Sequence, residues 1–280
     1  MELPLSIYPR LENRFPMGRD FVLLLDLDGV LVKNKRLDLF DDTLDFLAFL
    51  RDRGVPFRVV SNNSRIPPEE LRKRLAERGL VLNEDELITA LMVAPSYLKR
   101  FGSVFAFAEE GVKEYLKKSG INVVDDWDVD AVFIAQNHGV NFDDIKKVTT
   151  ALKKNGAKLV AVNLNKLAKD SDGLFYPASG SWARMFAEAT DYPESQIISL
   201  GKPSSQFFKR ALEGFEGKTV YFASDDFYTD LIPAEFYGIK TIFMTTGKYT
   251  EEDLKKAGYK PHKTFHSLTE LKGFVEKLLR

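Results

Sequence analysis

Short runs of apolar residues alternate with amphipathic stretches along most of the chain. The clearest run spans residues 21–25 and stops at two acidic residues, Asp26 and Asp28. An unbroken run of this kind is typical of a strand buried on both faces, as in a parallel sheet. Gly29 then allows the sharp turn that such a strand end needs. On a regular strand the two aspartates would face the same way, and their charges would repel unless a cation or a shared proton relieved them.

The same alternation predicts the order of elements along the chain. Further strands are expected at residues 56–60, 104–108, 121–124, 131–135, 158–162, 197–200, 218–223 and 239–244. Helices are expected at residues 41–54, 67–79, 109–120, 142–155 and 268–279, and loops at residues 170–173 and 177–180. This alternation indicates an α/β fold, a doubly wound parallel sheet. The middle third can continue that sheet or form an inserted α/β domain, and the pattern alone does not choose.

Polar residues of one chemical kind follow four of the predicted strands. They are Asp26 with Asp28, Ser61 with Asn62, Lys202, and Asp225 with Asp226. Because the carboxyl ends of parallel strands lie on one edge of a sheet, these groups can converge. Carboxylates can hold Mg²⁺ and one of them can attack phosphorus, while lysine and hydroxyl groups neutralise phosphate oxygens. The set therefore indicates metal-assisted phosphoryl transfer.

Each of these groups also has an ordinary structural explanation. Asp26 and Asp28 are compatible with a strand end followed by a solvated acidic turn. Ser61 and Asn62 are compatible with a simple Asx-type turn, and Lys202 is compatible with a solvated surface lysine. Asp225 and Asp226 are well placed to cap a following helix. The functional interpretation depends on all four groups occurring in this order, each at the end of a strand.

The composition excludes several classes of function. The 280 residues carry a formal net charge of −1, so there is no basic field for nucleic acid and no polybasic patch for a membrane. The absence of cysteine rules out disulfides and thiolate chemistry, and the three histidines are scattered. Residues 1–10 look like an irregular lead-in and not a signal peptide, and no apolar run is long enough to span a bilayer. We therefore expect a cytoplasmic protein.

The strand-end motifs resemble those of the haloacid dehalogenase superfamily of phosphotransferases. Residues 26–30 are similar to its first motif and residues 61–64 to its second. Residues 201–203 are similar to its lysine motif, and residues 225–230 to its acidic fourth motif. Asp28 marks the phosphatase branch, since dehalogenases lack that acid. The resemblance implies a Mg²⁺-dependent phosphatase that acts on a small phosphorylated metabolite through an aspartyl-phosphate intermediate.

The middle of the chain resembles the large α/β cap of the NagD-like, para-nitrophenylphosphatase-like branch of this superfamily. The residues that carry this likeness are 107–111, 124–125, 130–132 and 161–165. The resemblance implies a Rossmann-like core formed by residues 1–81 and 181–280, with an inserted α/β cap domain at residues 82–180. Members of this branch often dimerise through the cap, so a homodimer is compatible with the sequence.

Carried across position by position, the resemblance assigns four residues to the chemistry. Asp26 would be the nucleophile and a magnesium ligand. Asp28 would be the general acid and base, and its backbone carbonyl would be a second ligand. Asp225 would be the third protein ligand of magnesium, and Lys202 would neutralise the phosphate.

The remaining matched positions would bind the substrate or orient other groups. Those that would hold the phosphate or meet the substrate are Ser61, Asn62, Asn163 and Asn165. Asp226 and Asp230 would orient the magnesium ligands from outside, either directly or through water.

The chain departs from the family pattern at three places. Ser224 stands where the fourth motif usually has glycine, and residues 162–165 replace a threonine-asparagine-proline-aspartate motif. Residues 177–180 match a glycine-richer family loop only approximately. Two alternatives to a phosphatase therefore stay open. A phosphotransferase or phosphomutase would pass the same intermediate to an acceptor other than water. A non-catalytic protein would keep only a phosphate or metal site on the same scaffold.

Overall fold

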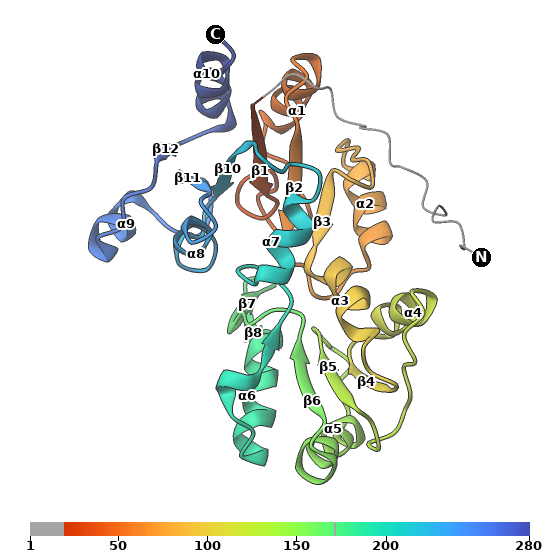
Figure 1. Cartoon of the computed structure of the whole chain (residues 1–280). Helices are drawn as coiled ribbons and strands as arrows, with labels where there is room; N and C mark the ends of the chain where they lie inside the picture. The colour runs from red at the N-terminus through yellow and green to blue at the C-terminus, as the bar shows by residue number, and fades with distance from the viewer. Residues whose placement is uncertain (1–19, 171) are drawn as a thin grey trace, which may run out of the picture.

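The computed structural model describes residues 20–170 and 172–280 (Figure 1). Within these residues, the strands form two parallel sheets and one hairpin. The first sheet has the strand order β12-β11-β10-β1-β2-β3, and the second has the order β4-β5-β6-β9. The irregular lead-in predicted for residues 1–10 lies outside the described residues.

The first sheet and its helices come from both ends of the chain and are called here the first-sheet region. Its strands are β1 (Phe21–Asp26), β2 (Phe57–Ser61), β3 (Leu87–Thr89), β10 (Thr219–Ser224), β11 (Lys240–Met244) and β12 (Lys263–Phe265). Its helices are α1 (Thr43–Asp52), α2 (Pro68–Glu77), α3 (Ala90–Leu98), α7 (Ser205–Leu212), the π-helix η2 (Phe227–Leu231), α8 (Ile232–Glu235), α9 (Glu251–Ala257) and α10 (Leu268–Leu278).

The second-sheet region is made by the middle of the chain. Its sheet contains β4 (Val104–Phe107), β5 (Ala131–Ile134), β6 (Lys158–Ala161) and β9 (Ile198–Ser199). Its helices are α4 (Glu110–Lys118), α5 (Phe142–Asn155), α6 (Ser179–Thr190) and the 3₁₀ turn η1 (Glu194–Gln196). The antiparallel hairpin joins β7 (Leu167–Lys169) to β8 (Phe175–Pro177). Figure 1 shows this hairpin at the level between the two sheets.

Strand β1 is buried on both faces, as its apolar run predicts. Leu24 joins one hydrophobic cluster, whereas its neighbours Leu23 and Leu25 join another on the opposite face. Side chains of α7 complete the first cluster, and side chains of α1, α2 and α10 complete the second. Helices on both faces explain why this strand has no polar alternation.

The first hydrophobic cluster continues into the second-sheet region. Besides Leu24 and Phe222 of the first sheet, it contains Val104, Phe133 and Val160 of β4, β5 and β6. The two regions are therefore joined by apolar packing as well as by the chain.

The second sheet begins and ends later than the predicted cap segment at residues 82–180. Strand β3 pairs with β2, so it belongs to the first sheet. Strand β9 pairs with β6, although the sequence places it among the returning strands of the core. A strand of two residues is too short for its hydrophobic pattern to specify a partner.

Most other predicted elements are confirmed, with two local exceptions. The predicted helix 142–155 is α5, which starts after the side-chain cap of Asn141 and ends at the left-handed Gly156. The predicted strand 121–124 makes only an isolated bridge, between Val104 and Val123. The loop predicted for residues 177–180 instead begins helix α6 at Ser179. Among the described residues, no helix has the length and apolar character needed to cross a membrane.

Candidate active site

Three of the four predicted strand ends converge on one edge of the first sheet. Asp26 ends β1, Ser61 ends the neighbouring β2, and Ser224 ends β10 on the other side of β1. Asp225 follows Ser224 directly. The fourth group, Lys202, follows β9 of the second sheet and reaches the same place from there. The expectation that all four strands share one sheet is therefore wrong for the lysine, although the side chains do meet.

Lys202 and two aspartates form a buried ion cluster at this edge. The Lys202 ammonium donates to Oδ1 of Asp26 at 2.8 Å and to Oδ2 of Asp230 at 2.7 Å. All three side chains are less than one tenth exposed. The Ser224 hydroxyl lies 2.7 Å from Oδ2 of Asp230 and 3.2 Å from Oδ2 of Asp26. Asp230 is thus a direct partner of the lysine and the serine.

The Asn62 side chain fixes the backbone of Lys202. Its Oδ1 accepts from the Lys202 N–H at 2.7 Å, and its Nδ2 donates to the Lys202 carbonyl at 3.1 Å. The turn packs tightly, because a Cβ on Gly201 would lie 2.5 Å from Asn62 Oδ1. Asn62, predicted to hold the phosphate, therefore aligns the lysine in this structure.

Two glycines form a close-fitting cradle around the Asp225 carboxylate. A Cβ on Gly29 would lie 2.1 Å from Asp225 Oδ2, and a Cβ on Gly247 would lie 1.9 Å from it. The same oxygen accepts a hydrogen bond from the Lys248 N–H at 2.6 Å. Gly29 also has φ +75°, so both its conformation and its surroundings require glycine.

The two carboxylates nearest the sheet edge carry raised pKa values. Burial raises the pKa of Asp26 well above its ordinary value, and Asp230 and Asp225 add to the shift, although Lys202 opposes it. Burial also raises the pKa of Asp225 to about 7, against the hydrogen bond from Lys248. Lys202 keeps its charge, because the two aspartates outweigh the effect of burial and raise its pKa above the ordinary value.

This donor set fits a magnesium ion. Asp26 and Asp225 are carboxylates held close together in a water-poor place, where a cation would relieve the cost of their charges. No group of three or more acidic, histidine or cysteine side chains within residues 20–170 and 172–280 is arranged to hold a metal. Two carboxylates are sufficient for Mg²⁺, which keeps several waters and takes oxygens from a substrate phosphate.

Asp28 does not continue the strand in line with Asp26. Strand β1 ends at Asp26, and the chain turns at Gly29. The Asp28 carboxylate lies 2.7 Å from the ammonium of Lys35, and the two side chains are 43% and 50% exposed. Asp28 is therefore accessible to solvent, whereas Asp26 is enclosed.

Asp226 has the ordinary structural role weighed for it from the sequence. Its Oδ1 caps η2 by accepting from the Thr229 N–H at 3.0 Å, and its Oδ2 pairs with Lys248 at 2.7 Å. Although burial opposes the effect, these contacts lower the pKa of Asp226. Asp226 thus fixes the segment that holds Asp225.

The predicted substrate positions on the second-sheet region differ in their surroundings. Asn163 is buried, and its Nδ2 donates to the Asn62 carbonyl at 2.8 Å. Its Oδ1 accepts from the Ser179 hydroxyl and from the Asn165 N–H, both at 3.0 Å. Asn165 is half-buried. Asn163 therefore links the two regions, while Ser61, fully buried, accepts from the Asn63 N–H at 3.1 Å.

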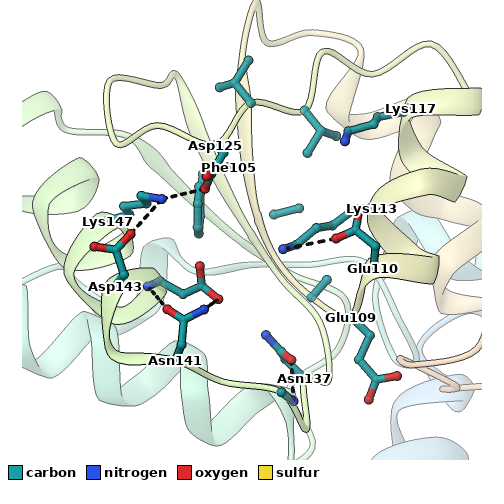
Figure 2. A pocket seen from close by; sticks show the side chains of 16 residues that line it. Phe105, Glu109, Glu110, Lys113, Lys117, Asp125, Asn137, Asn141, Asp143 and Lys147 are labelled. Carbon is teal, nitrogen blue, oxygen red and sulfur yellow. Dashed lines mark hydrogen bonds and ion pairs between the residues drawn. The ribbon is translucent and has the colours of Figure 1, made fainter.

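A cavity of about 930 Å³ lies on the second-sheet region, away from this cluster (Figure 2). It lies between α4 and α5, and two of its lysines, Lys113 and Lys147, pair with carboxylates that also line it. Lys147 contacts Asp125 at 2.7 Å and Asp143 at 2.9 Å. We do not assign phosphoryl transfer to this cavity, because the strand-end residues that fit that chemistry do not line it.

The sequence did not point to three residues at or beside the cluster. Ser224 was noted only as a departure from a family motif, yet its hydroxyl lies between Asp26 and Asp230. Lys35 and Lys248 lie in loops without a motif. The position of Ser224 immediately before an acidic pair was the one available signal.

Comparison with known proteins shows which family this chain resembles. The family profile described as haloacid dehalogenase-like hydrolase matches residues 23–122, and a second profile, HAD-hydrolase-like, matches residues 199–271. The chain is 27% identical to an acid sugar phosphatase of Staphylococcus saprophyticus over 91% of this chain and 97% of that protein.

Two solved structures extend the comparison. The p-nitrophenyl phosphatase from Archaeoglobus fulgidus is 25% identical and superposes with a TM-score of 0.80, over 92% of this chain and all of that one. NagD from Escherichia coli is 22% identical, with a TM-score of 0.78 over 91% of this chain and 98% of that one, and it shares the fold.

Proposed function

Because the chain belongs to the haloacid dehalogenase-like hydrolases, we propose that it is a Mg²⁺-dependent phosphatase acting on a small phosphate monoester. The observation that carries this proposal is the buried cluster of Asp26, Lys202 and Asp230 beside Asp225. Such a cluster is costly to desolvate, so its place at the sheet edge favours a chemical role over a structural one.

The proposed reaction has two half-reactions. In the first, a carboxylate oxygen of Asp26 attacks phosphorus, the bond from phosphorus to the ester oxygen breaks, and Asp28 gives its proton to the leaving alcohol. In the second, Asp28 takes a proton from a water molecule whose oxygen attacks the aspartyl-phosphate. Inorganic phosphate leaves, and the carboxylate of Asp26 is restored.

Lys202 would stabilise this reaction by its fixed position. Its ammonium lies beside the attacking carboxylate, and Asn62 holds its backbone at both the N–H and the carbonyl. A charge that is already oriented stabilises developing negative charge without reorganisation. Ser61 and Asn62 stay our predicted phosphate contacts, and Asp230 with Ser224 would keep the lysine and Asp26 aligned.

Asp26, Asp225 and the backbone carbonyl of Asp28 are the groups that would hold Mg²⁺. When bound, the ion would supply positive charge against the phosphate oxygens. The cradle of Gly29 and Gly247 would keep the Asp225 carboxylate in one orientation. Asp226 would support it from outside through Lys248 and Thr229.

The substrate class stays broad in this proposal. The names of the similar proteins differ, an acid sugar phosphatase in one case and a p-nitrophenyl phosphatase in another. We propose that the second-sheet region acts as the cap that restricts access to small metabolites, with Asn165 on its substrate-facing loop. A homodimer through that region also stays a prediction, which light scattering of the purified protein would test.

The decisive experiment measures phosphate release from para-nitrophenyl phosphate and a panel of small monoesters, with Mg²⁺ and with EDTA. Mg²⁺-dependent turnover in the wild type and none in Asp26→Asn is the expected result. Parallel reactions with added acceptor alcohols would reveal phosphate transfer and favour the phosphotransferase alternative. Binding of Mg²⁺ or phosphate without any turnover would instead favour a non-catalytic protein.

A further inference from the structure

Lys35 lies beside the side chain that we propose for proton transfer. It stands in the loop after β1, and its ammonium is 2.7 Å from Oδ1 of Asp28. Asp28 raises the pKa of Lys35 against the opposing effect of burial, and Tyr176 and Asp26 raise it further. Asp28 and Asp26 are proposed site residues, so the Lys35 ammonium lies beside the site.

A residue of the second-sheet region interacts electrostatically with Lys35. Tyr176 comes from strand β8, and the charges of Lys35, Asp170, Arg65 and Asp28 act on its hydroxyl. Its ring packs edge-on against His138, with 4.9 Å between the ring centroids. An ammonium from one region thus interacts electrostatically with a phenol from the other.

The second cation near Tyr176 is already engaged. Arg65 pairs with Glu109 at 2.9 Å, and this ion pair joins the two regions. Lys35 and Asp28, by contrast, form a pair in which each side chain is about half exposed. A small anion can reach the Lys35 ammonium without breaking a contact between the regions.

We propose that Lys35 is a specificity-determining residue that binds an anionic group on the alcohol portion of the substrate. This inference rests on the proposed function, because it places the leaving group beside Asp28. A leaving oxygen and a Lys35 ammonium that both hydrogen-bond to Oδ1 of Asp28 lie within about 5.5 Å of each other, which is two hydrogen-bond lengths. A carboxylate or phosphate one or two carbons from the ester oxygen spans that distance.

The charge argument favours a monoester with a second anion over a neutral one. A cation near the leaving group attracts the anionic substrate and leaves the neutral analogue without a partner. The probes are 2-phosphoglycolate, which carries a carboxylate, and 2-hydroxyethyl phosphate, which has a hydroxyl at the same place. The wild type is expected to have a higher kcat/KM for 2-phosphoglycolate.

The test compares this preference among three variants. Lys35→Met is expected to lower the ratio of the two kcat/KM values by at least about tenfold, mainly through a higher KM for 2-phosphoglycolate. Lys35→Arg should keep most of the ratio, because it keeps the charge. Lys33→Met is the matched control, since Lys33 stands in the same loop and pairs with Asp41 at 2.7 Å. An unchanged ratio in Lys35→Met, or an equal loss in Lys33→Met, would overturn the proposal.

A binding measurement separates this inference from the proposed function. Titration calorimetry in the Asp26→Asn background compares the affinities for the two probes without turnover, with and without Lys35→Met. A preference for 2-phosphoglycolate that disappears with Lys35→Met supports the inference, even if the wild type hydrolyses neither compound. Equal affinities for the two probes in the Asp26→Asn variant that keeps Lys35 would overturn the inference, even if the wild type hydrolyses para-nitrophenyl phosphate.

Discussion

The two sheet regions use charged side chains in opposite ways. In the first-sheet region, Lys202 and its partners Asp26 and Asp230 are enclosed by protein. In the second-sheet region, Lys147 bridges Asp125 and Asp143 on a surface where both carboxylates are mostly exposed. Both clusters pair a lysine with two aspartates, but the first is buried and the carboxylates of the second are exposed to water.

That difference supports the proposed location of the active site. Desolvating a buried ion pair costs free energy that its attraction only partly recovers, whereas an exposed pair costs and contributes little. The buried cluster therefore suggests a role beyond stability, and the exposed pairs do not. The contrast also explains why a cavity between α4 and α5 is a weaker candidate for catalysis than the sheet edge.

The largest expected effect comes from the same substitution made in both regions. Asp26→Asn should lower kcat for para-nitrophenyl phosphate by at least about a thousandfold, because it removes the proposed nucleophile while keeping its shape. Asp143→Asn, in the exposed bridge, should leave turnover near the wild-type value. Steady-state phosphate release measures kcat for both variants. Comparable losses of kcat would contradict the claim that only the buried cluster takes part in catalysis.

The second effect concerns the two lysines. Lys202→Met should destabilise the fold by about 3–5 kcal/mol, because Asp26 and Asp230 would stay buried without their cation. Its activity should fall by about a hundredfold or more. Lys147→Met should not change the denaturation midpoint measurably, since its partners are solvated. Urea unfolding of both variants provides the test, and similar midpoints would refute the distinction.

The third effect is the pH dependence of the metal-free protein. The pKa of Asp225 is raised to about 7 from an ordinary value of 3.8, so the folded state keeps this proton to higher pH than the unfolded chain. The raised pKa of Asp225 therefore adds to the free energy of unfolding. This contribution is complete below pH about 4 and is lost as the pH rises through about 7. It amounts to a few kcal/mol at most, at roughly 1.4 kcal/mol for each pKa unit.

Thermal unfolding in EDTA at pH 5 and pH 8 measures this dependence. Asp225→Asn should show a smaller loss of stability between the two pH values than the wild type. Added Mg²⁺ should raise the wild-type midpoint most at pH 8, where the carboxylate is ionised. Parallel pH profiles for the two proteins would show that Asp225 does not carry this effect.

Much of the candidate site was predictable because its residues follow strands with a clear hydrophobic pattern. The apolar runs before Asp26, Ser61 and Asp225 are long enough to predict buried strands, and parallel packing then brings their ends together. Helix 142–155 was predictable from its cap and its closing glycine. These signals are local in the sequence, and the structure has the predicted elements at these positions.

The features that the sequence did not predict depend on distant contacts. Strand β9 has two residues, so nothing local indicated that it pairs with β6 and carries Lys202 from the second sheet. The role of Ser224 depends on Asp26, nearly 200 positions away, and on Asp230. Lys35 lies in a loop whose path follows from tertiary packing.

The smallest expected effect tests the connection between the two regions. Asn163→Ala should destabilise the protein by about 1–3 kcal/mol, because it leaves the buried Ser179 hydroxyl and the Asn62 carbonyl without their partner. It should also lower kcat, since Asn62 positions Lys202. Asn165→Ala is the matched control two residues away, and it should change KM more than stability. If urea unfolding and steady-state kinetics gave Asn165→Ala the larger loss of stability, the connection would not run through Asn163.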